Sequence, residues 1–359
     1  MEKILVYGMT DTAGGMESYV MTMYRNIPKD KITFDFVTDW DKMAYQDEVL
    51  AGGSIIHHIP KKSDSIIGQI TAFSKILKKH KEYKKVYFNI MNASSFLNMI
   101  APILFGRKII VHSHNSFDEK VRLHKTFKGI MNFFADIKLA CSEGAARHMF
   151  TEKTIKNGDY RVIRNAINTE KFAFDKQKRE QKRQELGITD KFAVLHVGRM
   201  VNQKNPIYLI DIFAELLKIK PDSVLLYAGI GEMENEIKEY ANKLGISGSI
   251  KFLGACSDIP GLMCAADVFL LPSKYEGLAI VAVEAQMSDL KCFFSDNFPV
   301  EEITLTDNVR FLSIEANAAV WASEIAKTEI TARRDMTLQI SQKGYNIKNE
   351  IEKLLSAIS

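Results

Sequence analysis

The sequence predicts an α/β protein made of two Rossmann-like domains, each with a doubly wound parallel sheet. Short apolar runs rich in β-branched and aromatic residues alternate with helical segments along all 359 residues, which is typical of buried parallel strands and their crossover helices. In each half the first such run ends in a glycine-containing loop followed by a helix, the usual opening of a Rossmann-like domain. The length suffices for two domains of about 170 residues each.

The elements of the first half begin with a strand at 3–7, a glycine loop at 8–15 and a helix at 16–27. Further strands are expected at 32–37, 55–58, 85–88, 108–112, 137–140 and 161–163, and helices at 44–50, 65–80, 94–105 and 117–134. In the second half strands are expected at 192–197, 223–228, 250–254, 267–271, 291–294 and 308–312. The charged run 175–185 is expected to form a solvated helix between the domains, and 338–358 a single terminal helix.

Composition excludes several classes of protein. The four cysteines form no C-x-x-C pair, which argues against a disulfide framework and a zinc site. No apolar run approaches the roughly 18 residues of a membrane-spanning helix, and the N-terminus is a strand rather than a signal peptide, so a cytoplasmic protein is expected. Residues 1–172 carry 26 Lys and Arg against 18 Asp and Glu, whereas residues 173–359 carry 22 against 26. The basic first half predicts an anionic partner, and nucleic acid is not expected.

The most informative stretch runs from Pro272 to Gln286 and has the order strand, loop, helix. A helix that starts near Ala279, at the carboxyl end of a parallel strand, points free N–H groups at that edge and favours phosphate. Glu276 and Glu284 lie beside this anion site, and carboxylates there are suited to accept hydrogen bonds from sugar hydroxyls. The pattern indicates a site for a phosphorylated sugar, most simply a nucleotide sugar. The alternative is that both are solvated surface charges.

A second loop follows the strand at 192–197 and contains Gly198, Arg199 and Lys204 before a helix that starts at Pro206. The planar guanidinium, the ammonium and the N–H groups of the helix start together predict a pyrophosphate clamp. The alternative is two ordinary surface cations.

Polar residues also follow the strand at 108–112, where His112, His114 and Asn115 face the edge at which open α/β sheets bind ligands. An imidazole there is suited to orient a hydroxyl, relay a proton or contact a transferred sugar. The alternative is a pair of hydrogen-bonded histidines with a structural role. The sequence Asp39-Trp40-Asp41 resembles a D-x-D metal motif, but no third oxygen ligand is evident, and no metal is expected.

On these motifs the chain resembles the retaining glycosyltransferases of family 4, which have the GT-B fold of two facing Rossmann-like domains. It is most similar to the bacterial capsular and exopolysaccharide members. The resemblance rests on the Glu-x7-Glu spacing, the Gly-Arg…Lys-Asn loop and the Gly-Gly-x-Glu loop at 14–17, and it spans nearly the whole chain. Two departures stand out: Ala166 replaces a glycine in the turn at 165–168, and Ser288-Asp289 stands where a glycine is usual.

The resemblance implies domains at 1–173 for the acceptor and 174–337 for the nucleotide-sugar donor, with 338–359 crossing back to the first domain. The implied catalytic residues are Glu276, His114, Arg199 and Lys204. The implied donor contacts are Gly15, Arg199, Lys204, Leu253, Glu276, Gly277, Leu278, Ala279 and Glu284, the last holding the ribose. The implied acceptor-side residues are Gly14, Glu17, His112 and Asn115.

The expected activity is metal-independent transfer of a sugar, with retention of configuration, from a nucleotide diphosphate donor such as a UDP-sugar to a saccharide or a lipid-linked saccharide. No cofactor is expected. The alternatives are a sugar-nucleotide epimerase of the same fold and a non-catalytic partner that binds a nucleotide sugar.

The helix at 117–134 mixes apolar residues with Lys120, Arg122, Lys125 and Lys128. Such a helix in the basic first domain is suited to lie on an anionic membrane surface, which would place the protein at the inner face of the cell membrane. The alternative is a helix packed on the sheet with its cations in water.

Overall fold

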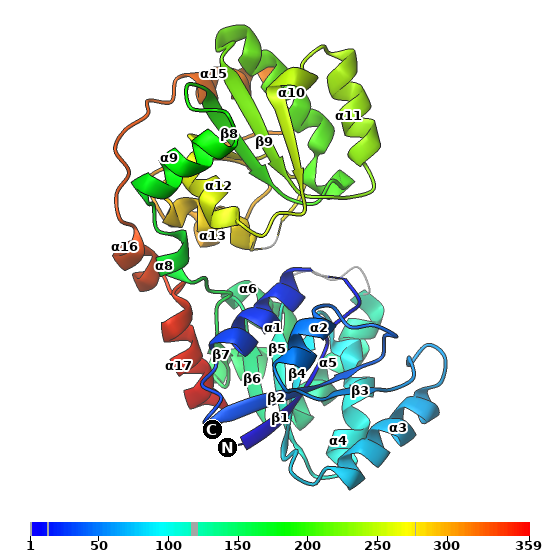
Figure 1. The fold of residues 1–359 in the computed structure, drawn as a ribbon. Helices are drawn as coiled ribbons and strands as arrows, with labels where there is room; N and C mark the ends of the chain where they lie inside the picture. Colours follow the sequence, from blue (N-terminus) through cyan, green and yellow to red (C-terminus); the bar gives the residue numbers. More distant parts are fainter. Residues whose placement is uncertain (1, 13, 116–120, 277) are drawn as a thin grey trace. The chain divides into compact units, whose positions relative to one another are not determined.

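The computed structural model describes residues 2–12, 14–115, 121–276 and 278–359. Its contacts divide the chain into two compact units, the first formed by residues 1–166 and 347–359 and the second by residues 167–346. Figure 1 shows that each unit is a sheet with helices on both faces.

The first unit contains a seven-stranded sheet in the order β3-β2-β1-β4-β5-β6-β7, with every neighbouring pair parallel. Its strands are β1 (Glu2–Tyr7), β2 (Ile32–Thr38), β3 (Ile56–His58), β4 (Lys85–Ile90), β5 (Lys108–Ser113), β6 (Ile137–Ala140) and β7 (Arg161–Val162). The winding reverses between β1 and β4, and a crevice at the carboxyl ends of the strands is expected at this point.

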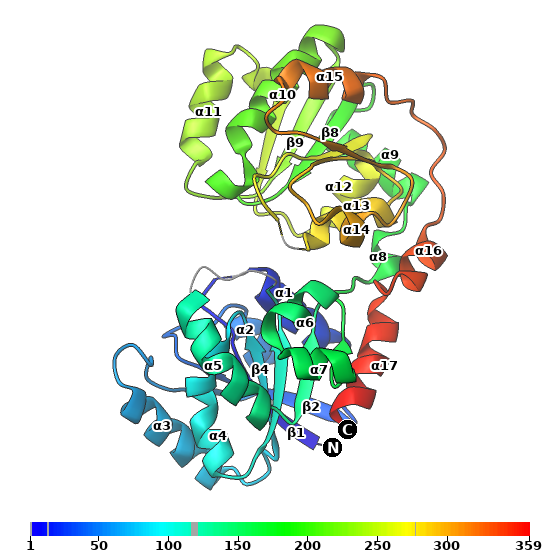
Figure 2. The same cartoon turned by 180° about the vertical axis from the view of Figure 1, so that it is seen from behind.

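The helices of the first unit cover both faces of this sheet and bury one apolar cluster on each. They are α1 (Gly15–Asn26), α2 (Gln46–Ala51), α3 (Ile66–Lys79), the 3₁₀ helix η1 (Ala93–Met99), α4 (Ile100–Leu104), α5 (Val121–Phe134), α6 (Glu143–Met149), α7 (Glu152–Asn157) and α17 (Ile347–Ile358). The last of these brings the end of the chain back to its beginning (Figure 2). Lys85 binds both, since its Nζ donates to Glu2 at 3.1 Å and to the carbonyl oxygen of Ile358.

The second unit contains a six-stranded parallel sheet in the order β10-β9-β8-β11-β12-β13. Its strands are β8 (Phe192–Val197), β9 (Ser223–Ala228), β10 (Ile250–Gly254), β11 (Val268–Leu271), β12 (Lys291–Ser295) and β13 (Val309–Leu312). Its helices are α8 (Thr169–Phe172), α9 (Lys176–Glu185), η2 (Asn202–Lys204), α10 (Pro206–Ile219), α11 (Glu234–Lys243), η3 (Ser247–Ser249), α12 (Ile259–Ala265), α13 (Ile280–Met287), α14 (Val300–Ile303), α15 (Ala318–Ala326) and α16 (Thr337–Gln342).

The prediction of a solvated helix between the domains at 175–185 was wrong in part: the helix is present as α9 and most of its side chains are exposed, but it belongs to the second unit. Helix α9 packs on α12, and two of its arginines bind the buried Asp267, which precedes β11: Arg179 at 2.5 Å and Arg183 at 3.3 Å. The same carboxylate accepts the amide of Ala193 in β8 at 2.7 Å. A buried carboxylate without a partner is costly, and the two arginines provide that partner for Asp267. The charged run is therefore part of the second unit.

The prediction of one helix over 338–358 was also wrong. Gly344 has φ +85° and separates α16, in the second unit, from α17, in the first. A positive φ does not continue an α-helix, and only glycine adopts it at no cost. The chain leaves the first unit at residues 166–167, slightly before the boundary expected from the sequence, and re-enters it at residues 346–347.

Candidate active site

Two loops of the second unit emerge at the same sheet edge, because β8 and β11 are parallel neighbours where the winding of this sheet reverses. They are the β8 loop (residues 198–205) and the β11 loop (residues 272–279). Lys274 donates its amide to the carbonyl of Gln203 at 2.8 Å and its Nζ to Asn202 at 2.7 Å. Gln203 in turn donates to the carbonyl of Tyr275 at 3.1 Å. The two loops are therefore tied into one structure.

An ion pair joins the same two loops. The Nζ of Lys204 lies 2.5 Å from Oε1 of Glu276, and the two side chains are only 14% and 7% exposed. Asn205 follows with φ +55°, which ends η2 and directs the chain into α10 at Pro206. Lys204 and Glu276, assigned to the site on separate motifs, are thus direct partners.

Arg199 differs from Lys204 in its surroundings. Its side chain is exposed, and no hydrogen bond or ion pair of its guanidinium occurs within the described residues. Of the two cations expected to form the clamp, one is therefore open to solvent and the other is held by a carboxylate.

Two glycines in the loop after β9 pack against the backbone of the β8 loop. The sequence analysis did not assign them to the site. Gly229 has φ +152°, and a Cβ there would lie 1.9 Å from the carbonyl oxygen of Gly198. A Cβ on Gly231 would lie 2.4 Å from that of Met200. The loop after β9 can approach the β8 loop this closely only without side chains. The sequence signal was present in the pair of glycines directly after a strand.

Helix α13 begins at Ile280, after Leu278 and the buried Ala279, both of which contact the core of the unit. Gly277 lies outside the described residues. Glu284, one turn into the helix, is half-buried, and no hydrogen bond to its carboxylate occurs in the part of the chain described. Burial raises the pKa of Glu284 to about 7. When it is ionised, this carboxyl group is a hydrogen-bond acceptor with no partner in the part of the chain described.

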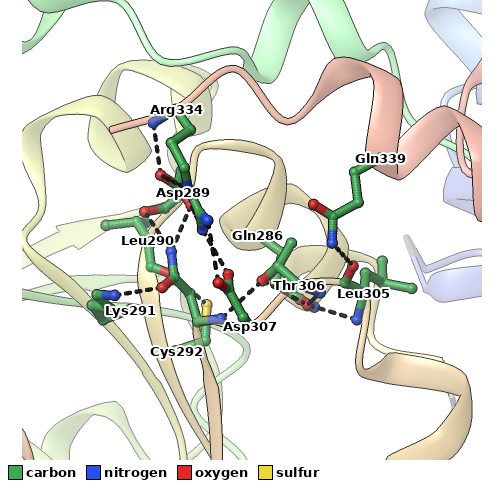
Figure 3. Close-up of polar contacts among 11 residues, drawn as sticks. Gln286, Asp289, Leu290, Lys291, Cys292, Leu305, Thr306, Asp307, Arg334 and Gln339 are labelled. Carbon is green, nitrogen blue, oxygen red and sulfur yellow. Dashed lines mark hydrogen bonds and ion pairs between the residues drawn. The ribbon is translucent and has the colours of Figure 1, made fainter. Parts of the chain in front are cut away.

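The C-terminal end of α13 is held by polar contacts (Figure 3). They give a structural reason for an aspartate at position 289. Asp289 has φ +49°, a conformation that suits glycine, asparagine or aspartate. Its carboxylate accepts hydrogen bonds from Arg334, the shortest at 2.7 Å, and from Asn308 at 2.5 Å. Gln286, fully buried, accepts the amide of Leu305 at 2.9 Å. These contacts fix the helix that carries Glu284.

The first unit presents a separate polar group at the carboxyl ends of β4 and β5. Nε2 of His114 lies 2.8 Å from the carboxamide oxygen of Asn89. An amide oxygen only accepts, so the ring carries its proton on Nε2 and Nδ1 is left as an acceptor. Nδ1 is buried and has no hydrogen-bond partner among the residues that the structure describes. Burial lowers the pKa of His114 to about 3, which keeps the imidazole neutral. Gly8, with φ +121°, packs on the backbone of Asn89.

His112 lies deeper in the same unit and is fully buried. The hydroxyls of Tyr87 and Tyr19 lie 2.6 and 3.2 Å from its Nδ1, and its ring stacks on that of His114 with 4.3 Å between centroids. The pKa of His112 lies well below its ordinary value. Burial is the main cause, and the neighbouring His114 is the second. His112 therefore fixes the ring of His114 from behind.

Glu17 is also an internal support. Its carboxylate accepts from the Thr10 hydroxyl at 2.7 Å and from the amide of Gly14 at 3.1 Å, and it is 4% exposed. It closes the glycine loop on the start of α1 at Gly15. Asn115 is half-buried after β5, and its carbonyl accepts from Ser113.

Two remaining candidates lie at other places. Leu253, near the end of β10, is partly buried against the core, and Gly254 after it accepts the amide of Gly229 at 2.8 Å. Asp39 accepts the hydroxyl of Tyr7 at 3.1 Å. No group of three or more His, Cys, Asp or Glu side chains suited to a metal ion occurs among the residues described.

Comparison with known proteins identifies the family. Residues 13–171 match the model of Glycosyltransferase Family 4, and residues 178–346 match that of Glycosyl transferases group 1. EpsF of Bacillus subtilis, which is named as a glycosyltransferase, is 30% identical over 96% of this chain and 92% of its own. The chain belongs to glycosyltransferase family 4. The family 4 chain is also similar to the UDP-Gal:alpha-D-GlcNAc-diphosphoundecaprenol alpha-1,3-galactosyltransferase of Escherichia coli, at 29% identity over 64% of this chain and 63% of that one.

The fold agrees with this assignment. The crystal structure of Anabaena HepE in complex with UDP-glucose superposes with a TM-score of 0.76 and covers all of both chains at 20% sequence identity. The family 4 enzyme thus has the GT-B fold, and the expectation of two Rossmann-like domains with parallel sheets is confirmed.

Proposed function

We propose that this glycosyltransferase moves a sugar from a UDP-sugar to a saccharide or lipid-linked saccharide during synthesis of a surface polysaccharide, with retention of configuration. The observation that carries the proposal is the pairing of Lys204 with Glu276 beside the exposed Arg199, at the carboxyl edge of the second sheet. The names of the E. coli relative and of the HepE complex support a UDP-sugar donor, and the former supports a lipid diphosphate acceptor.

The chemical demand of the reaction is the charge that develops on the departing diphosphate. Arg199 offers a planar fork of N–H donors, and Lys204, largely removed from water, offers a point charge. Both cations stabilise the negative charge on the diphosphate. Two cations and the helix start after Ala279 supply the stabilisation for which other enzymes use a metal, so no metal or cofactor is required. A same-face displacement, in which the leaving phosphate takes the proton of the acceptor hydroxyl, accounts for retention.

The two carboxylates bind the uncharged parts of the donor. Glu284 accepts hydrogen bonds from the ribose, and Glu276 from hydroxyls of the transferred sugar. His114 is neutral at physiological pH because of its low pKa, so it does not act as a proton donor from Nδ1, and its proton lies on Nε2. Asn89 keeps the ring in that tautomer.

The test is an acceptor-dependent transfer assay by mass spectrometry, with UDP-, GDP- and dTDP-sugars. Glu276→Gln and Lys204→Ala should each lower transfer by orders of magnitude with an unchanged circular dichroism spectrum. Rates near those of the wild type would refute these roles. Activity should survive a chelator, and loss of activity that manganese restores would instead implicate Asp39 and Asp41. The anomeric configuration of the product, measured by NMR, tests retention.

We also propose that the first unit contacts the membrane through the outer face of α5, defined as Arg122, Leu123, Lys125, Ile130 and Phe133. None of the described helices is long and apolar enough to cross a bilayer. Helix α5 nevertheless exposes Leu123 by 48%, Ile130 by 44% and Phe133 by 81%, on one side of the helix beside two exposed cations. This combination suits the interface of an anionic bilayer.

One cation named earlier does not belong to this face, and another lies outside the described residues. Lys128 donates to the carbonyls of Arg147 and His148 at the end of α6, and Lys120 lies outside the described residues. Combined replacement of Arg122 and Lys125 by glutamine should weaken binding to anionic liposomes, and the same change at the exposed Lys153 and Lys156 of α7 should not. Equal binding by both variants would contradict the proposal.

A further inference from the structure

The ion pair between Lys204 and Glu276 raises the question of how the donor diphosphate gains access to Lys204. The ammonium expected to bind the diphosphate is already 2.5 Å from a carboxylate, and both side chains are largely removed from water. A paired ammonium carries little net field, and the carboxylate beside it repels phosphate. Either the pair persists and Lys204 contributes little to donor binding, or the pair opens when the donor binds.

Opening a desolvated ion pair is costly unless each partner gains a replacement. A nucleotide sugar provides both replacements, because its phosphate oxygens accept from Lys204 while its sugar hydroxyls donate to Glu276. A nucleoside diphosphate without the sugar provides only the first and leaves Glu276 unpaired beside the phosphate.

The β8 and β11 loops can stay joined to each other when the ion pair opens. The contacts of Lys274 with Gln203 and Asn202, and of Gln203 with Tyr275, join the β8 and β11 loops independently of the ion pair. The methylene chain of Lys204 passes close to Gly198, where a side chain would meet its Cγ and Cδ at 3.5 Å. The ammonium can therefore turn from carboxylate to phosphate while its stem and both loops stay in place.

We infer that Glu276 occupies Lys204 as a stand-in for the donor diphosphate and is exchanged for it when a nucleotide sugar binds. The exchange makes the site favour the nucleotide sugar over the nucleoside diphosphate product, because only the former satisfies both members of the broken pair. Arg199, exposed and without a partner in the described chain, makes the first contact with the diphosphate. This inference rests on the proposed function.

The experiment is calorimetric titration of the full chain with UDP and with uridine. Variants are Glu276→Gln, Lys204→Met, the double variant and Glu352→Gln, which removes one exposed carboxylate from α17 as a charge-matched control. Glu276→Gln should bind UDP about tenfold more tightly than the wild type, because its Lys204 is free, while uridine binding stays within twofold. In the Lys204→Met background the same change should tighten UDP binding by less than threefold. Glu352→Gln should match the wild type.

The double-mutant cycle separates exchange from simple repulsion. If Glu276 only repelled the diphosphate, its removal would help more in the absence of Lys204, and that sign of coupling would overturn the inference. An unchanged or weaker UDP affinity of Glu276→Gln would overturn it as well, with the proposed function intact. If the wild type bound no UDP, the proposed function and the exchange would both fall.

Discussion

Replacing Glu284 with glutamine should stabilise the second unit in a pH-dependent way. Burial on α13 raises the pKa of this carboxyl from its ordinary 4.5 to about 7. Below pH 4.5 both folded and unfolded chains carry the proton, and the carboxyl costs nothing. As pH rises from 4.5 to 7 the unfolded chain releases its proton first, so the native state loses stability. At about 1.4 kcal/mol per pH unit, the complete loss above pH 7 is about 3 kcal/mol, which glutamine avoids.

The assay is urea unfolding followed by fluorescence at pH 5 and pH 8. The chain has two tryptophans, so Trp40→Phe leaves Trp321, fully buried in the second unit, as the reporter of that unit. In this background Glu284→Gln should be nearly neutral at pH 5 and more stable by up to about 3 kcal/mol at pH 8. Glu352→Gln, exposed on α17, should show neither effect. A gain at pH 8 no larger than that at pH 5 would show that Glu284 is solvated, and its assignment as an open acceptor would fall with it.

Three further changes test the supports of the site, each by urea or thermal unfolding. Asp289→Ala should be less stable than Asp289→Gly by about 1 kcal/mol, because both lose the contacts with Arg334 but only glycine adopts φ +49° without strain; the reverse order would refute the backbone argument. Gly231→Ala should cost about 1–3 kcal/mol and weaken UDP binding, since its Cβ meets a carbonyl oxygen at 2.4 Å, and a neutral change would contradict the close approach. Tyr87→Phe should cost about 1–3 kcal/mol by leaving Nδ1 of His112 with a weaker partner, and full stability would mean that this hydrogen bond is dispensable.

The fold was predictable because parallel strands buried on both faces appear in the sequence as uninterrupted apolar runs. The run at 223–228 became β9 and that at 192–197 became β8, with the same bounds. The loops of the site were predictable for a related reason, since the residues directly after each strand of such a sheet lie at the ligand edge. Arg199, Lys204 and Glu276 were assigned to these loops from local order and from the family resemblance, and their roles stay predictions.

The partners of these residues were not predictable from one sequence. Lys204 and Glu276 are 72 positions apart, and the spacing along the chain says nothing of which cation meets which carboxylate. The same applies to Arg179, which looked solvated because its partner Asp267 lies 88 positions later. By contrast, Gly344 was a local indication of the break between α16 and α17. It was overlooked because the apolar residues of the two helices repeat with a helical period.

The contribution of α17 to the first unit has a consequence for how the protein is made. Four residues of α17 (Ile347, Ile351, Leu354 and Ile358) complete an apolar cluster whose other buried members lie in residues 4–166. On the ribosome residues 1–166 are synthesised first, but the helix that covers this cluster emerges only after the whole of residues 167–346. Until that helix is made, the nascent first unit carries an open hydrophobic surface, and a chain truncated before residue 347 would leave this surface uncovered.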